Sequence, residues 1–356
     1  VEIMVYNCQL LDDRLAQYCE SRADKLIQLP EGLSNQVQKM RSHDLDILLI
    51  ATNIADTAKP TALLSLHRLA RLQIATAASN PIFPTSPNID RIIVGEFTLP
   101  PDTPTEYREK LITLPGSGIC FSYPIASASP TIQPTRSSWG ATDQSVVFVS
   151  GVEAFKIIPE LRETWAKIIA SVPNSILVLC PFRYGQENYP TLPFFHQMRS
   201  TFAKSGIDKN RLVMIRALPN RADCIKCLEL ADIYLDSYPY SGASSLAEPL
   251  LAGVPVVARK GETSRSRVGA ALLRELQLPE LVADSDNSYI ELSVALGNNP
   301  ELRQHYRTRL QQTMATNPKL LNSRAYSCQL GTALEEIFRR ENGKSKKERS
   351  IMSYEL

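Results

Sequence analysis

The stretch SYPYSGASSLAEPLLAGVPVV, residues 237–257, decides the fold because a glycine-bearing loop and a short helix here connect two strand-like runs. The preceding ADIYLD (231–236) and the closing VPVV are apolar and of strand length. Gly253, with a proline two residues later, is a helix stop signal. Ser245 and Glu248 have the spacing of a capping box at the start of a helix. The stretch therefore predicts a strand–loop–helix–strand unit of an α/β fold.

Strand-like apolar runs alternate with helix-like stretches along most of the chain. Strands are expected at residues 1–6, 45–52, 72–78, 91–97, 146–151, 175–180, 211–217, 231–236 and 254–259. Helices are expected at residues 12–26, 59–71, 158–173 and 324–341, after each of the loops near 245 and 267, and in most of the chain from 287 onward. This alternation is typical of parallel βαβ units.

Residues 121–144 are rich in proline, serine and threonine, which is a linker composition. The chain also opens directly on a strand-like run, where an α/β domain normally has an earlier strand, loop and helix. We therefore expect an incomplete amino-terminal domain at 1–133, a second Rossmann-like domain at 134–323, a closing helix at 324–342 and a charged tail at 343–356.

Composition places the chain among ordinary globular proteins, with 44% hydrophobic and 21% charged residues. A net charge of +2 gives no indication of nucleic-acid binding, and no apolar run reaches the roughly 20 residues of a membrane span. The seven cysteines are scattered and odd in number, which favours reduced thiols and a cytoplasmic location. Cys224 and Cys227 form a C-x-x-C pair, which we interpret as two neighbours on one helical turn, since no second pair has zinc-like spacing.

Three loops that follow strands carry groups suited to an anion. The 237–257 stretch places Gly242 and several hydroxyls before a helix, whose first turn presents backbone N–H groups and partial positive charge. GVEAFKIIPE (151–160) carries Lys156, and GETSRSR (261–267) carries two arginines. Because the carboxyl ends of parallel strands share one rim, we expect these loops to meet and to bind a diphosphate. The alternative is that they are ordinary strand–helix connections with solvated cations.

These residues lie in two segments that resemble glycosyltransferase family 41, the protein O-GlcNAc transferase/SPINDLY family. The segments are LADIYLDSYPYSGASSLAEPLLAGVPVVARKGETSRSRVGAALL (230–273) and FKIIPELRETWAKIIASVPNSILVL (155–179), and the amino-terminal half is similar at 46–73, 84–95 and 106–118. The resemblance implies a glycosyltransferase B fold, in which two Rossmann-like domains face a cleft. It also implies a metal-independent, inverting enzyme without a cofactor that moves GlcNAc from UDP-GlcNAc to Ser or Thr of acceptor proteins.

The resemblance assigns residues to this reaction. Lys156 matches the lysine that grips the diphosphate and stabilises the departing group, and Glu248 matches an acidic residue that holds the ribose hydroxyls. The loop from Ala217 to Arg221 matches the segment that recognises the base. The implied donor-binding residues are Glu153, Lys156, Ala217, Arg221, Ser241, Gly242, Ala243, Ser244, Ser245, Glu248, Gly261, Glu262 and Arg267, and Thr85 and Ser86 match the loop that faces the donor sugar.

Several positions depart from the family pattern. Ala243 and Cys224 stand where the animal enzymes have histidines, and Glu153 stands where the family often has glutamine. The family's amino-terminal segment with a functional histidine, and the tetratricopeptide repeats usual upstream of it, have no counterpart in this sequence; we interpret His67 as structural. Two alternatives therefore stay open. One is a related transferase with a fucosyl or glucosyl donor, and the other is a non-catalytic relic that binds nucleotide or protein.

Overall fold

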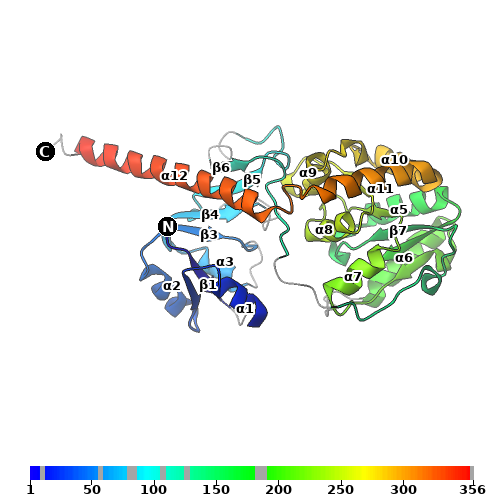
Figure 1. Ribbon diagram of the computed structural model, residues 1–356, viewed down its shortest axis with the longest axis horizontal. Coiled ribbons are helices and arrows are strands. Elements are labelled where there is room, and N and C mark those ends of the chain that lie inside the picture. The colour runs from blue at the N-terminus through cyan, green and yellow to red at the C-terminus, as the bar shows by residue number, and fades with distance from the viewer. Residues whose placement is uncertain are drawn as a thin grey trace. The chain divides into compact units, whose positions relative to one another are not determined.

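The structure is a computed structural model that describes residues 1–8, 13–54, 59–77, 86–104, 110–123, 129–180 and 191–352. The chain forms two compact units (Figure 1). Unit 1 comprises Val1–Glu96, Pro101–Ile125 and Ser323–Leu356, and unit 2 comprises Phe97–Pro100 and Ala126–Asn322. The chain thus passes from unit 1 into unit 2 and ends in unit 1.

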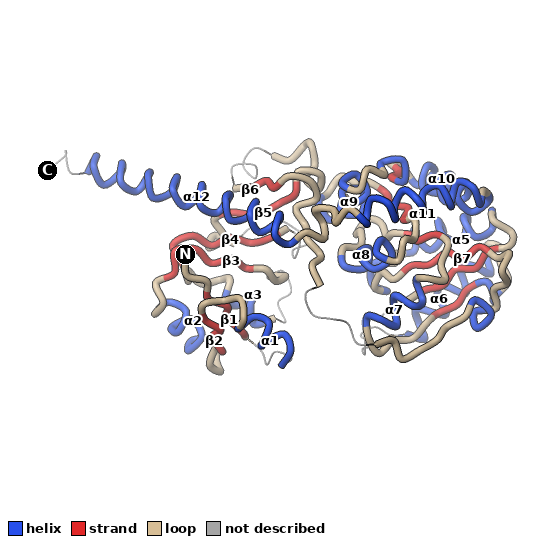
Figure 2. The backbone as a smooth tube through the Cα atoms, viewed as in Figure 1, coloured by secondary structure: helices blue, strands red, loops and turns tan. Residues whose placement is uncertain are grey.

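Unit 2 contains a six-stranded sheet in the order β12-β11-β10-β7-β8-β9, in which every pair of neighbours is parallel. Figure 2 shows strands in red and helices in blue. The strands of this sheet are β7 (Val146–Ser150), β8 (Ser175–Leu179), β9 (Leu212–Met214), β10 (Ile233–Leu235), β11 (Val256–Arg259) and β12 (Val282–Ala283). Five of them were expected. The two-residue β12 is too short to produce a periodic signal in the sequence.

Helices connect these strands, as the alternation of the sequence predicts. They are α5 (Pro159–Ser171), α6 (Thr191–Lys204), α7 (Arg221–Leu228), α8 (Ser244–Leu251), α9 (Val268–Glu275), α10 (Asp286–Asn298) and α11 (Pro300–Ala315). Helix α5 buries an apolar face with Leu161, Trp165, Ile168 and Ile169, and the side chains of β7 and β8 are buried along their whole length. Continuous burial explains why SILVLC is apolar at successive positions, since a strand covered on both faces has no solvent side.

Unit 1 has a four-stranded parallel sheet in the order β3-β4-β5-β6 and a separate parallel pair, β1-β2. The strands are β1 (Met4–Asn7), β2 (Lys25–Gln28), β3 (Leu45–Ile50), β4 (Ala70–Thr76), β5 (Arg91–Gly95) and β6 (Leu111–Leu114), and the helices are α1 (Asp13–Glu20), α2 (Leu33–Arg41) and α3 (Pro60–Leu64). The expected helix at 12–26 is wrong in its second half, because β2 pairs with β1. The expected helix at 59–71 is also too long, because β4 begins at Ala70.

The carboxyl-terminal helix α12 (Ser323–Met352) belongs to unit 1 and packs along its sheet (Figure 1). Tyr326, Leu330 and Ile337 lie against a cluster of strand side chains that includes Leu72, Ile74, Ile93, Ile112 and Leu114. The helix continues to Met352, beyond the expected helix end at 342. Within the described residues, no helix combines the length and the apolar character needed to cross a membrane.

Candidate functional site

The sheet of unit 2 has a point at which the strand order reverses. From β7 the chain proceeds through β8 and β9 to one edge, and from β10 it proceeds through β11 and β12 to the other. β7 and β10 are neighbours, so the loops after them leave the sheet side by side. Ligands of open α/β sheets bind outside the carboxyl ends of the strands at such a point. The segments with Lys156 and Gly242 are the two loops that begin there.

The structure brings Lys156 into contact with the loop after β10. Its ammonium nitrogen Nζ donates to the carbonyl oxygen of Ser241 at 3.1 Å and lies 3.9 Å from the ring centroid of Tyr240. The two loops also meet through Tyr234 of β10, whose hydroxyl accepts from Gly151 N at 3.0 Å. Three of the expected donor residues, Glu153, Lys156 and Ser241, therefore lie in two loops that touch, because Glu153 begins the short helical turn that ends in Lys156.

Helix α8 begins two residues earlier than the capping-box pattern at Ser245 indicates, and the predicted capping box is wrong. Ala243 is the N-cap residue, and no side chain of the described residues caps the helix. Ser244 opens the first turn, and Ser245 follows it and bonds to the hydroxyl of Tyr234. The first N–H groups of a helix have no acceptor within the helix, so this uncapped end presents donors and a partial positive charge.

Glu248 is buried inside α8 and does not cap it. Its Oε1 lies 3.2 Å from Nε of Arg221, the first residue of α7, and the Glu248 residue is only 5% exposed. Arg221 follows the loop that leaves β9 after Met214 and that contains Ala217, and Asn220 caps α7 by accepting from Asp223 N. The ion pair therefore connects the predicted base-recognition loop with the predicted phosphate-binding helix.

The loop after β11 also joins this rim. Ser241 N donates to Arg265 O at 3.0 Å, so this loop is bonded to the one after β10. Gly261 packs against Ser266, whose Oγ would lie 2.3 Å from an added Cβ, which explains the need for glycine. Glu262 is exposed, whereas Arg267 is 8% exposed and donates to Gly261 O at 3.0 Å. The buried Arg267 side chain thus stabilises this loop through its bond to the Gly261 backbone. Burial lowers the pKa of its guanidinium group.

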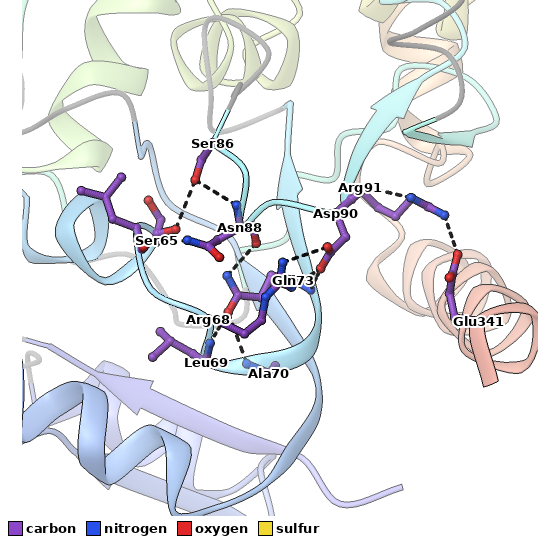
Figure 3. Close-up of polar contacts among 11 residues, drawn as sticks. Ser65, Arg68, Leu69, Ala70, Gln73, Ser86, Asn88, Asp90, Arg91 and Glu341 are labelled. Carbon is purple, nitrogen blue, oxygen red and sulfur yellow. Dashed lines mark hydrogen bonds and ion pairs between the residues drawn. The ribbon is translucent and has the colours of Figure 1, made fainter. Parts of the chain in front are cut away.

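Ser86 lies in unit 1, within a loop held by hydrogen bonds (Figure 3). Its hydroxyl donates to Ser65 O at 3.5 Å and accepts from Asn88 N at 3.3 Å. The side chain of Asn88 donates to Leu66 O at 2.6 Å, and Gln73 donates to Asn88 O at 2.8 Å (Figure 3). These bonds fix the loop against α3 and β4. Thr85, the other residue predicted on this side, lies outside the described residues.

Comparison with known proteins assigns the family. Residues 126–330 match the family model described as Glycosyl transferase family 41. The chain belongs to glycosyl transferase family 41. The matched range contains the loops after β7, β9, β10 and β11, and so contains the whole rim described above.

Curated relatives of this family 41 chain include plant and animal proteins. A protein of Oryza sativa subsp. japonica named probable UDP-N-acetylglucosamine–peptide N-acetylglucosaminyltransferase SPINDLY is 32% identical over 256 residues, which is 71% of this chain and 26% of the relative. A Caenorhabditis elegans UDP-N-acetylglucosamine–peptide N-acetylglucosaminyltransferase is 27% identical over 206 residues, 58% of this chain and 17% of the relative. The chain thus spans about a quarter or less of the length of these relatives.

Solved structures confirm the glycosyltransferase B fold. A mutant O-GlcNAc transferase from Thermobaculum terrenum superposes with a TM-score of 0.77 at 21% identity, covering 97% of this chain and 63% of the other. A glycosyltransferase from Rickettsia africae superposes with a TM-score of 0.55 at 9% identity, covering 95% of this chain and 89% of the other. At such identities the likeness concerns the fold alone.

Three cysteines lie near the rim of unit 2. Cys224 and Cys227 both lie on α7, as expected, and Cys180 directly follows β8. Burial raises the pKa of Cys227 to about 11 and raises that of Cys180 well above its ordinary value. Protonated thiols are poor metal ligands and nucleophiles. In the described part of the chain, no three His, Cys, Asp or Glu side chains are grouped so as to hold a metal ion.

Asp236 is a residue of the site that the sequence did not single out. It follows β10 directly and is 1% exposed. Burial raises the pKa of its carboxyl group to about 6, although hydrogen bonds from Ser241, Gly242 and Ser237 and the charge of Lys156 act in the opposite direction. In the sequence, this residue appears only as the polar end of a strand. The available signal was its place between an apolar strand and a glycine-bearing loop.

Proposed function

We propose that this chain carries the donor site of a glycosyltransferase that moves a sugar from a nucleotide diphosphate to a Ser or Thr of an acceptor protein, in the cytoplasm. The observation that carries the proposal is the contact of Lys156 with the Ser241–Gly242 loop at the strand-order reversal of unit 2. Family membership and the names of the relatives support UDP-GlcNAc as the donor.

The chemistry follows from charge. When the acceptor hydroxyl attacks the anomeric carbon, the bond to the diphosphate breaks and negative charge develops on the departing UDP. Lys156 and the uncapped amino terminus of α8 would stabilise that charge, and both are in place before the reaction. This positive field is our reason to propose a metal-independent transfer, and a single direct displacement at the anomeric carbon would invert its configuration. Glu248 and the Ala217–Arg221 loop would hold the ribose and base, and Ser86 would face the sugar.

The role of Lys156 is tested by isothermal titration of UDP into the Lys156→Ala variant. Loss of an ammonium group that contacts a diphosphate should weaken UDP binding at least about tenfold and abolish transfer. Lys167→Ala is the matched control, because Lys167 is exposed on the neighbouring helix α5 and should leave UDP affinity unchanged. Unchanged UDP affinity in Lys156→Ala would remove the basis of the proposal.

The departures from the family pattern affect one part of the proposal, which is the choice of donor. Ala243 precedes α8 without a polar side chain, and Cys224 lies on α7 near the predicted base site. Thermal shift with UDP-GlcNAc, UDP-glucose and GDP-fucose separates the alternatives, and we expect the largest stabilisation with UDP-GlcNAc. Stabilisation by GDP-fucose alone would show that the donor is GDP-fucose and not UDP-GlcNAc. Binding of UDP without transfer to any acceptor would favour the non-catalytic alternative.

A further inference from the structure

Asp236 has a buried carboxylate to which the proposed reaction gives no role. Its Oδ1 accepts from Ser237 N at 2.8 Å and from Gly242 N at 2.7 Å, and its Oδ2 accepts from Ser241 Oγ at 2.5 Å. All three donors belong to the loop between β10 and α8. Hydrogen bonds to an ionised acceptor are shorter and stronger than those between neutral groups, so the carboxylate binds this loop firmly.

The same residue is fixed from behind by other elements. The hydroxyl of Tyr289 on α10 donates to the backbone oxygen of Asp236 at 2.9 Å, and Trp165 of α5 donates to that hydroxyl at 3.3 Å. Ser241 Oγ also accepts from Gly269 N of α9 at 2.8 Å. Through its backbone oxygen, and through Tyr289 and Ser241, Asp236 is therefore linked to α10, α5 and α9 of unit 2.

Two glycines make room for this carboxylate. A Cβ added at Gly269 would lie 2.4 Å from Asp236 Oδ2, and one added at Gly242 would lie 3.1 Å from Asp236 Oδ1 and 2.5 Å from Ser245 Oγ. Any side chain at Gly269 would therefore displace the carboxylate. Because neither glycine has a side chain, Gly242 N can reach Asp236 Oδ1 and Gly269 N can reach Ser241 Oγ.

One peptide group links the Asp236 carboxylate to the ammonium group of Lys156. The N–H of Gly242 and the C=O of Ser241 belong to the same planar, trans peptide, so they point in opposite directions. The N–H donates to Asp236, and the C=O accepts from Lys156 Nζ at 3.1 Å. By holding the N–H, Asp236 orients the carbonyl that receives the ammonium group.

We propose that Asp236 is a positioning residue: by fixing the Ser241–Gly242 peptide, it places Lys156 and the amino terminus of α8 for binding of the nucleotide diphosphate. This inference rests on the proposed function, since it concerns the same site. It adds a residue that does not touch the substrate and acts through the loop. Its loss should weaken binding of the diphosphate and spare binding of the nucleoside.

The chain offers a matched control at the other end of the same strand. Asp232 directly precedes β10 as Asp236 directly follows it, and it accepts from Val147 N at 2.7 Å and pairs with Arg136 at 3.0 Å. These contacts stabilise unit 2 far along the strand from the loop. Asp232→Ala therefore reports the general cost of removing a structural aspartate from this sheet.

The test measures UDP binding by titration and uridine binding by competition in the intact chain. Asp236→Ala should lower UDP affinity at least about tenfold and leave uridine affinity within about twofold. Asp236→Asn, whose amide oxygen can still accept from Ser237 N and Gly242 N, should recover part of the UDP affinity. Asp232→Ala should lower the melting temperature and leave UDP affinity within about twofold.

Two outcomes of the titration would overturn the inference. One is UDP affinity in Asp236→Ala equal to that of the wild type, and the other is an equal loss of UDP and uridine affinity, which indicates a structural role only. If Asp236→Ala does not fold, the Asp236→Asn variant decides between these outcomes. We expect its UDP affinity to fall about threefold and its uridine affinity to stay unchanged.

Hydrogen exchange without ligand separates this inference from the proposed function. If the wild-type chain binds no UDP, the donor-site proposal fails, but the role of Asp236 in ordering the loop can still be measured. Exchange at residues 237–246 should be at least about tenfold faster in Asp236→Ala, which removes the acceptor of two of these N–H groups, than in the wild type and unchanged in Asp232→Ala. Equal exchange in the two aspartate variants would show that Asp236 does not order the loop.

Discussion

At the scale of single residues, several of the predicted charged groups of the site have partners within the protein. Lys156 donates to Ser241 O, Glu248 pairs with Arg221, and Arg267 donates to Gly261 O. Burying a charge without a partner costs far more free energy than leaving it in water, so these contacts hold the groups in place.

The raised pKa of Asp236 leads to a prediction about stability and pH. Burial raises this pKa to about 6 in the folded protein, whereas an unfolded aspartate has a pKa near 4. A group of this kind contributes stability that is full below the unfolded pKa and is lost as the pH rises through the folded pKa. The wild-type free energy of unfolding in urea, relative to Asp236→Asn, should fall by up to about 3 kcal/mol between pH 4 and pH 7.

The other titratable groups near Asp236 do not interfere with this measurement. Lys156 faces it from the loop after β7, Tyr234 from β10 and Tyr289 from α10. Burial raises the pKa of both tyrosines, so neither phenol ionises in this range. A lysine ordinarily remains a cation there. A difference between the two proteins that stays constant, or that grows with pH, would contradict the prediction.

Some residues of the site were predictable from sequence and some were not. Lys156 and Gly242 could be placed at one rim because parallel strands all end at the same edge, and the structure has them in touching loops. The capping box at Ser245 and Glu248 failed because Glu248 has a stronger partner, Arg221, which comes from another helix 27 positions away in sequence. Local spacing carries no information about such partners.

At the scale of elements, α7 holds the segment by which the chain enters unit 2. Asp223, in the first turn of α7, accepts from Thr131 N at 2.5 Å, from Thr131 Oγ1 at 2.8 Å and from Ile132 N at 3.0 Å. Asn220 caps the helix by accepting from Asp223 N at 3.1 Å. One aspartate thus orders a proline-rich segment whose composition alone would leave it without regular structure.

Removal of this contact should loosen the segment and spare the sheet. In Asp223→Ala, hydrogen exchange at residues 129–135 should accelerate at least about tenfold, because the N–H groups of Thr131 and Ile132 lose their acceptor. Exchange in β7 and β8 should not change. Asp208→Ala is the control, since Asp208 is exposed and caps only the short turn at Lys209–Arg211. Unchanged exchange at 129–135 would mean that other contacts order this segment.

Sequence reasoning missed the strands β2, β6 and β12 and also the helices α2 and α6. β2 and β6 have four residues each and β12 has two, and none of them contains enough residues to show a period. Residues 12–26 have a helical apolar pattern throughout, yet the last part forms β2 because β1 offers a parallel partner there. Pairing with β1 therefore outweighed the local helical pattern, as is common for strands.

At the scale of the whole molecule, the chain closes unit 1 with its last helix. α12 covers apolar side chains of β4, β5 and β6, and Arg91 of β5 bonds to Glu341 of this helix at 2.5 Å (Figure 3). The expected domain order had a closing helix at 324–342, which falls within α12. Residues nearly 300 positions apart in sequence thus complete one core, and unit 1 depends on a segment synthesised after unit 2.

This arrangement predicts separate effects on the two units when residues 323–356 are deleted. The deletion uncovers several buried Leu and Ile side chains of unit 1, a loss of roughly 5 kcal/mol or more, which is comparable with the stability of a whole domain. Limited proteolysis should therefore cleave residues 1–125 rapidly. Titration should show UDP affinity within about threefold of the full chain, because the proposed donor site lies in unit 2.

Glu341→Gln is the milder control for this deletion. Its ion pair with Arg91 is partly exposed, and loss of that pair should cost no more than about 1 kcal/mol. A parallel loss of UDP binding on deletion would show that unit 2 needs unit 1 in order to fold, and resistance of residues 1–125 to protease would show that α12 is dispensable to the unit it covers.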